Sequence, residues 1–119
     1  MAKTITDYLG NGAELSGAIL TVDLSVLKAV VDPNDDGSRA ALTEDMAIAI
    51  LVAGLHKNAL PQTDANGLAV VEPTTALVAN ESFQSKTFEV RGEAAQVRHE
   101  FIFSIYTADD TDFDPDKVV

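Results

Sequence analysis

The clearest alternation of apolar and polar positions lies in the last third of the chain. Residues 96–106 are typical of a strand with one bulky face, formed by Val97, His99, Phe101, Phe103 and Ile105. Residues 82–91 alternate in the same way around Phe88 and Val90, and residues 92–95 connect the two runs. The pattern predicts a long β-hairpin. Because four of the five phenylalanines lie in it, we expect it to supply much of the core.

A second apolar run, residues 46–55, predicts a helix. Thr43 fits the N-cap position, and Glu44 and Asp45 then lie in the first turn, where acidic side chains are favoured. Pro61 ends the helix shortly after residue 58. Because the run is apolar on every side, we expect the helix to be buried all round. It would either cross the centre of the domain with a sheet around it or present one face to another subunit.

The segment before this helix supports two interpretations. In residues 20–26 apolar and polar side chains alternate, which is typical of a half-buried strand. A helix that starts near Ser25 and includes Val31 explains the same residues, and the pattern does not separate the two. Residues 32–37, which consist of Asp, Pro, Asn and Gly, form a loop in either case.

These elements predict an α+β fold in which an antiparallel sheet, dominated by the long C-terminal hairpin, packs on one central buried helix. The length of 119 residues fits a single domain, residues 1–119, without an interdomain linker. We expect an N-terminal arm over about residues 1–17, where three glycines oppose long regular structure. An acidic C-terminal tail is expected over about residues 108–119.

Composition and charge narrow the choice of partners. Nineteen acidic residues against eight basic ones give a net charge of −11, which repels nucleic acid and anionic lipid. The longest apolar run has ten residues, half of the roughly 20 that a membrane span needs. The N-terminus lacks a secretory signal, and the absence of cysteine excludes disulfides and thiolate sites. The predicted partners are therefore proteins, with no direct contact to nucleic acid or membrane.

The loop after residue 31 carries the sharpest chemical hypothesis, a calcium site. Asp32, Asn34 and Asp36 occupy positions 1, 3 and 5 of an EF-hand loop. The bidentate acid should stand at Thr43 but is Glu44, one residue late, and no amphipathic helix precedes the loop. A looser oxygen-ligand site at these three residues is the candidate, and a solvated turn is the alternative.

Other groups of polar residues offer further candidate sites. The tail contains aspartates that could hold a hard cation, dock on a basic partner or simply be solvated, namely Asp109, Asp110, Asp112, Asp114 and Asp116. His56 fits a helix C-terminus and His99 a core position on a strand, so a joint metal site would require both to converge with a carboxylate. No nucleophile-elbow, phosphate-binding or dinucleotide-binding motif occurs, and we expect neither a cofactor nor enzymatic activity.

Two further segments lie near the ends of the chain, Lys3-Thr4-Ile5-Thr6-Asp7-Tyr8-Leu9-Gly10 and Phe113-Asp114-Pro115-Asp116. Together with the central helix and the long hairpin, they make the chain resemble a group of small uncharacterised proteins from cyanobacteria and their tailed phages. The resemblance covers most of the chain. It implies a virion component, such as a capsid cement or decoration protein or a neck or tail accessory, located in the virion or in the cytoplasm during assembly.

We therefore predict a non-enzymatic structural or assembly protein that forms a homo-oligomer and contacts other subunits, such as a capsid shell. The apolar residues expected to contact a partner are Ile5, Tyr8 and Leu9 in the arm and Phe113 in the tail. The first alternative is a small calcium-binding module that uses residues 32–36. The second is a small acid–base enzyme. Nineteen acidic side chains are available for such chemistry, but they form no catalytic motif.

Overall fold

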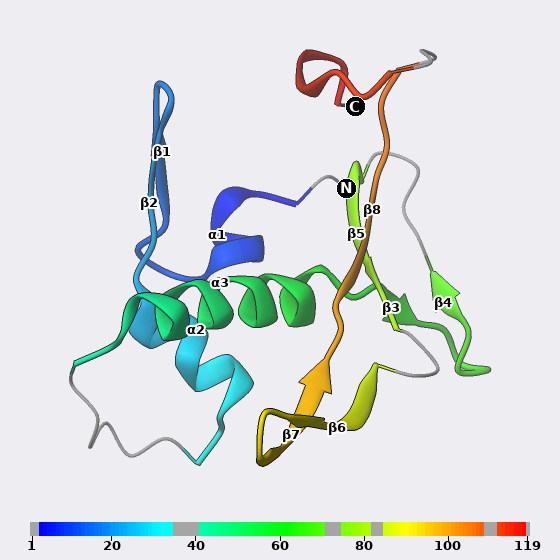
Figure 1. The fold of residues 1–119 in the computed structure, drawn as a ribbon. Coiled ribbons are helices and arrows are strands. Elements are labelled where there is room, and N and C mark those ends of the chain that lie inside the picture. Colours follow the sequence, from blue (N-terminus) through cyan, green and yellow to red (C-terminus); the bar gives the residue numbers. More distant parts are fainter. Residues whose placement is uncertain (1–2, 35–40, 71–74, 82–84, 109–111, 119) are drawn as a thin grey trace.

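The computed structural model describes residues 3–34, 41–70, 75–81, 85–108 and 112–118 (Figure 1). Its helices are α1 (Ile5–Leu9), α2 (Leu24–Val31), α3 (Glu44–Ala59) and the 3₁₀ turn η1 (Pro115–Lys117). Its strands are β1 (Glu14–Ser16), β2 (Ile19–Thr21), β3 (Gln62–Thr63), β4 (Ala69–Val70), β5 (Leu77–Asn80), β6 (Lys86–Arg91), β7 (Ala94–His99) and β8 (Ile102–Ile105). Within these residues the strands form antiparallel pairs, β1–β2, β3–β4, β5–β8 and β6–β7. This combination of helices and antiparallel strands confirms the predicted α+β class.

Helix α1 lies where a glycine-rich arm was expected. The Thr4 hydroxyl accepts a hydrogen bond from the Asp7 N–H, and the Asp7 carboxylate accepts one from the Thr4 N–H at 2.8 Å. These bonds, chiefly the backbone one, hold the pKa of Asp7 below its usual range. The helix packs on α3, Leu9 is buried, and the Tyr8 hydroxyl donates to the Leu77 carbonyl at 3.0 Å. The apolar side chains of this helix therefore find partners within the same chain.

The segment with two interpretations contains both a short strand and a helix. Strand β2 ends at Thr21, and Asp23 begins α2 by accepting hydrogen bonds from the Ser25 N–H at 3.0 Å and the Ser25 hydroxyl at 2.6 Å. Helix α2 packs against α3 and buries Leu27 completely, at 0% exposure. Gly54 of α3 lies against this leucine and is itself buried. Strand β2 therefore ends earlier than the strand predicted over residues 20–26, and α2 takes up the rest of that segment.

Helix α3 begins and ends close to where it was predicted. The Thr43 hydroxyl accepts a hydrogen bond from an N–H of the first turn, and the helix ends at Ala59, shortly before Pro61. Its packed side faces α1, α2 and β5, and Ile50 is buried there. The expectation of burial all round is wrong, because Ile48 on another side is 62% exposed and the described elements leave that side open.

The C-terminal hairpin is shorter than expected. Gly92, at φ 65° in the left-handed region, forms the turn between β6 and β7 together with Glu93. Strand β7 ends at His99, and the next strand, β8, pairs with β5. The predicted second arm is therefore divided, because β8 takes its backbone hydrogen bonds from β5 instead of β6. The expectation that the hairpin fills the core is wrong for β6–β7, where Phe88 is 82% exposed.

The core lies between the three helices, and the hairpins project from it (Figure 1). The buried cluster consists of Leu9, Ala13, Leu27 and Ile50. The radius of gyration is 16.4 Å, compared with about 13.5 Å for a compact domain of this length. The chain is therefore more open than a typical domain. Within the described ranges, no helix has the length and apolar character that crossing a membrane would need.

Candidate interaction surface

Large apolar side chains are exposed on two hairpins and near the C-terminus. Figure 1 shows that these hairpins, β1–β2 and β6–β7, project from the helices. The exposed side chains include Leu15, Ile19 and Leu20 on β1–β2, Phe88, Val90 and Val97 on β6–β7, and Phe113 and Val118 near the C-terminus. A single exposed apolar residue is ordinary, but a group on one face is typical of an interaction site. The group on β6–β7 is spread over two strands, so its geometry can be followed residue by residue.

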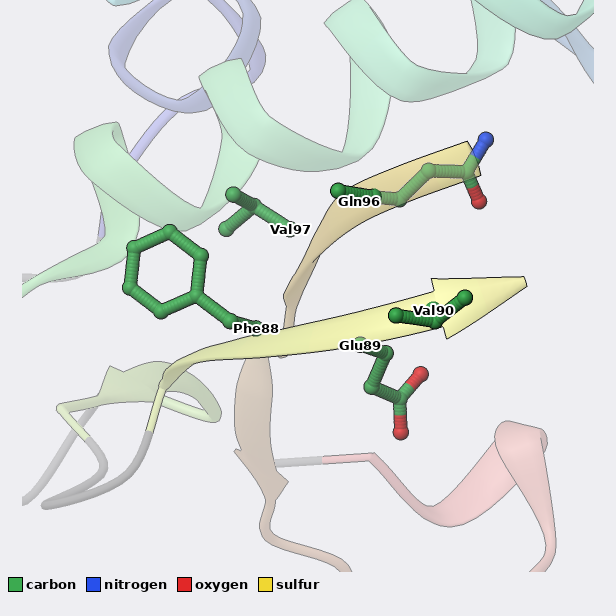
Figure 2. Close-up of a pocket in the computed structure, with 6 residues that line it drawn as sticks. Phe88, Glu89, Val90, Gln96 and Val97 are labelled. Carbon is green, nitrogen blue, oxygen red and sulfur yellow. The ribbon is translucent and has the colours of Figure 1, made fainter. Parts of the chain in front are cut away.

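One face of β6–β7, here named the hairpin face, collects the apolar side chains of both strands. It consists of the cross-strand pairs Lys86 with His99, Phe88 with Val97, and Val90 with Ala95. Directly opposite residues and every second residue point to the same side of an antiparallel pair, so these six share a face. Figure 2 shows the Phe88 ring beside Val97. A pocket of about 310 Å³ opens along the hairpin and is lined by Phe88, Glu89, Val90, Ala95, Gln96 and Val97.

The opposite face of the hairpin is polar and internally paired. Arg98 Nη1 lies 2.6 Å from Glu89 Oε1, and Arg98 Nε lies 3.0 Å from Glu100 Oε1. Glu89 is half-buried, whereas Phe88 and Val90 on the hairpin face are 82% and 73% exposed. The usual arrangement of a strand is thus inverted, because the apolar side chains point to solvent and the polar face is the partly covered one.

The exposure of the hairpin face leaves β6–β7 weakly supported. A two-stranded hairpin alone is marginally stable in water and needs a third strand or a packed face. Among the described residues no third strand pairs with β6 or β7. Burial of an apolar side chain the size of phenylalanine or valine stabilises by about 1.5–3 kcal/mol. A surface that covered Phe88 and Val90 would therefore stabilise the hairpin itself.

The C-terminal loop, defined as residues 112–118, presents a single aromatic side chain. An isolated β-bridge between Thr107 and Val118 closes the loop, and the Asp114 carboxylate caps η1 within it. Phe113 stands outside these contacts and is 64% exposed. The loop is therefore ordered by its own backbone and holds its aromatic ring in solvent.

The residues predicted as partner contacts divide into two groups. Ile5, Tyr8 and Leu9 pack on the helical core of their own chain. Phe113 is exposed on the C-terminal loop, and its contact with a partner stays a prediction. The hairpin face was not predicted as a site from the sequence. The alternation around Phe88 signalled an apolar face, but not whether the chain would cover it.

The predicted calcium loop lies only partly within the described residues. Asp32 ends α2, and its carboxylate accepts a hydrogen bond from the Asn34 N–H at 3.3 Å, as in an Asx turn. Asp36 lies outside the described residues, as do Asp109 and Asp110 of the tail. Across the part of the chain that is described, no three acidic or histidine side chains gather as metal ligands. The calcium site therefore stays a prediction.

The two histidines lie on different elements. His56 is in the last turn of α3, as predicted, and its Nε2 donates to the Asn80 carbonyl at 3.0 Å. Its ring meets Phe101 and Phe103 edge-on, with centroids 5.2 Å and 5.4 Å apart. His99 is exposed on β7, so the expectation of a core histidine is wrong. The division of the predicted hairpin arm explains this, because the hairpin face has no cover.

A second pocket, of about 580 Å³, lies beside the C-terminal end of α3 and includes both polar and apolar side chains. Its lining residues include His56, Lys57, Glu81, Glu100 and Phe101. The Lys57 ammonium donates to the Val30 carbonyl at 2.9 Å, and the histidine bonds to a β5 carbonyl. The basic side chains of this pocket therefore connect α3 to α2 and β5.

Comparisons with models of known protein families, with curated proteins and with solved structures find no match to the chain. Within the described residues, the hairpin face and the C-terminal loop each hold a phenylalanine in solvent outside the core cluster. Neither phenylalanine is part of the core cluster of its own chain. Both surfaces are therefore candidates for contact with another molecule.

Proposed function

We propose that this chain is a non-enzymatic assembly protein that works as a homo-oligomer. The observation that carries the proposal is the hairpin face, on which Phe88 and Val90 are 82% and 73% exposed. Organised apolar faces of this kind are typical of interaction sites. The absence of a third strand on this hairpin in the described chain adds a reason, because a cover supplied by another subunit would stabilise it.

The balance of burial over the described residues supports the same proposal. Seven apolar residues are buried, whereas fifteen large apolar residues are exposed. A chain that uses so little of its apolar surface internally has surface left for contact between subunits. The radius of gyration of 16.4 Å agrees with this view, because packing between copies would fill the space between the projecting elements.

Within this class we propose a virion component, such as a capsid cement or decoration protein. The support is the resemblance of the chain to small proteins of cyanobacteria and their tailed phages. The net charge of −11 also favours contact with protein over contact with nucleic acid. A component of this kind acts by covering neighbouring subunits and oligomerises about symmetry axes.

Light scattering coupled to size-exclusion chromatography tests the assembly proposal. At high micromolar concentration we expect a mass that is a multiple of the 12.6 kDa chain. The double variant Phe88→Thr/Val90→Thr removes the apolar hairpin face but places threonine, a residue that favours strands, at both positions, and we expect a monomer. The matched control Ile48→Thr changes an exposed residue on α3 and should assemble normally. A wild-type chain that stays monomeric under these conditions contradicts the proposal.

A further inference from the structure

We propose that the hairpin face of one copy binds the C-terminal loop of a second copy, with Phe113 seated in the pocket beside Phe88. This inference rests on the proposed function and specifies its interface. The contact joins two different surfaces, one from each copy. It is therefore a head-to-tail contact and not a symmetric one.

Charge complementarity favours this pairing. The hairpin face carries Lys86 and His99 and no acidic side chain. The acidic residue that lines the pocket, Glu89, belongs to the opposite face and is paired with Arg98. In the sequence, residues 86–99 contain three basic and two acidic residues, a net charge of +1 in a chain of −11. The C-terminal loop, residues 112–118, contains three aspartates and one lysine, a net charge of −2. Opposite local charges favour the loop on the hairpin, whereas two hairpin faces would bring like charges together.

Shape and exposure agree with the charges. Phe113 is 64% exposed and stands between Asp112 and Asp114. The hairpin pocket has a volume of about 310 Å³, and a cavity of about 150 Å³ is enough for a benzene molecule. The bridge between Thr107 and Val118 already orders the loop, so binding requires little further ordering.

The occupant has to come from another copy. Figure 1 places the C-terminal loop and the β6–β7 hairpin at opposite ends of β8. Strand β8 is held in this position by its ladder with β5, from Leu77–Ile105 to Asn80–Ile102. A loop could reach the hairpin of its own chain only if this ladder were broken. The loop of a second copy can reach the hairpin while the β5–β8 ladder stays intact in both copies.

A head-to-tail contact leaves one free hairpin face and one free loop on every incomplete assembly. Each added copy therefore offers a new site, and growth ends only when the assembly closes into a ring. The mass of the wild-type assembly distinguishes a closed ring, with one defined mass, from an open filament, with a distribution of masses. Both products are consistent with the same contact.

Complementation between two variants tests the contact. Phe88→Thr disables the hairpin face and keeps the loop, and Phe113→Ala disables the loop and keeps the hairpin face. Loss of an aromatic hot spot weakens association by about 30-fold or more, so we expect each variant alone to be monomeric. When the two are mixed, the intact loop of one can bind the intact hairpin of the other. We expect a 1:1 heterodimer that grows no further, measured by light scattering.

Circular dichroism of both variants should match the wild type, because both substituted side chains are exposed. The control Ile48→Thr should assemble like the wild type. If Phe113→Ala assembles like the wild type, or if the two monomeric variants do not combine, the head-to-tail contact is refuted while the proposed assembly function stands. If the wild type itself is monomeric, both are refuted.

Discussion

At the scale of single residues, Gly54 decides how closely α2 and α3 approach. A β carbon at this position would lie 2.8 Å from Leu27 Cδ2 and 3.0 Å from Leu27 Cβ. Leu27 is fully buried in a core packed on all sides, so it has no free space into which to move. The absent side chain of Gly54 is therefore what lets Leu27 fill the space between the helices.

We expect Gly54→Ala to lower the free energy of unfolding by about 1 kcal/mol. Overpacking of a core costs about 1–3 kcal/mol, and the better helix propensity of alanine offsets about 1 kcal/mol of this. Urea unfolding followed by circular dichroism measures the change. The control Ala49→Gly, at an exposed site of α3, isolates helix propensity and should cost about 1 kcal/mol. A more stable Gly54→Ala would show that propensity, and not the contact with Leu27, governs the position.

Of the two phenylalanines in the candidate interface, only Phe113 was predicted from the sequence as a contact residue. Phe113 was expected to contact a partner as the apolar residue of the acidic tail. Phe88 was expected in the core instead. Alternation shows that Phe88 and Val90 share a face, but burial depends on which other elements arrive there. That information is absent from the local pattern.

At the scale of elements, the N-terminus of α2 makes the fold sensitive to acid. The Asp23 carboxylate caps the helix, and its hydrogen bonds from the Ser25 hydroxyl and then the Ser25 N–H hold its pKa below the ordinary value of 3.8. The ionised form is therefore favoured in the folded state. This stabilisation is fully present above pH 3.8 and is lost as the pH falls through the lower pKa of the folded state.

We expect Asp23→Ala to lower the Tm near neutral pH, because α2 loses its cap. Well below pH 3.8 the difference from the wild type should shrink, since the wild-type carboxylate is then protonated. Thermal unfolding at the two pH values, followed by circular dichroism, measures this. Ser25→Ala removes only the hydroxyl donor and should give a smaller loss. An equal loss for Asp23→Ala at both pH values would rule out the charged cap as its cause.

Elements with local signals could be predicted from the sequence, and those set by distant pairing could not. Thr43 and Pro61 mark the ends of α3, and Gly92 marks the turn of the hairpin. The pairing of β5 with β8 leaves no local mark, because the two strands are far apart in the sequence. The alternation in residues 96–106 runs straight through the break between β7 and β8. The predicted arm therefore continued past the end of β7 at His99 and included β8, which belongs to another strand pair.

At the scale of the whole molecule, the helices bury apolar side chains within the chain and the hairpins expose theirs. The core cluster joins α1, α2 and α3 through residues of the same chain. The hairpins β1–β2 and β6–β7 project from this core (Figure 1). Their large apolar side chains are exposed. Burial therefore stabilises the helical part in a single copy, whereas the hairpins gain comparable burial only in an assembly.

This division predicts that thermal stability depends on protein concentration. A partner that binds only the folded state stabilises it by mass action, by about 1.4 kcal/mol for each tenfold increase above the dissociation constant. For a chain of this length, the Tm should rise by about 5–6 °C per tenfold increase in concentration. Scanning calorimetry over a hundredfold concentration range measures the effect. The double variant Phe88→Thr/Val90→Thr is the control, and its Tm should stay constant. A Tm that is equally constant for the wild type would mean that the hairpins need no partner, and the exposed hairpin face would then have to be stable in water by itself.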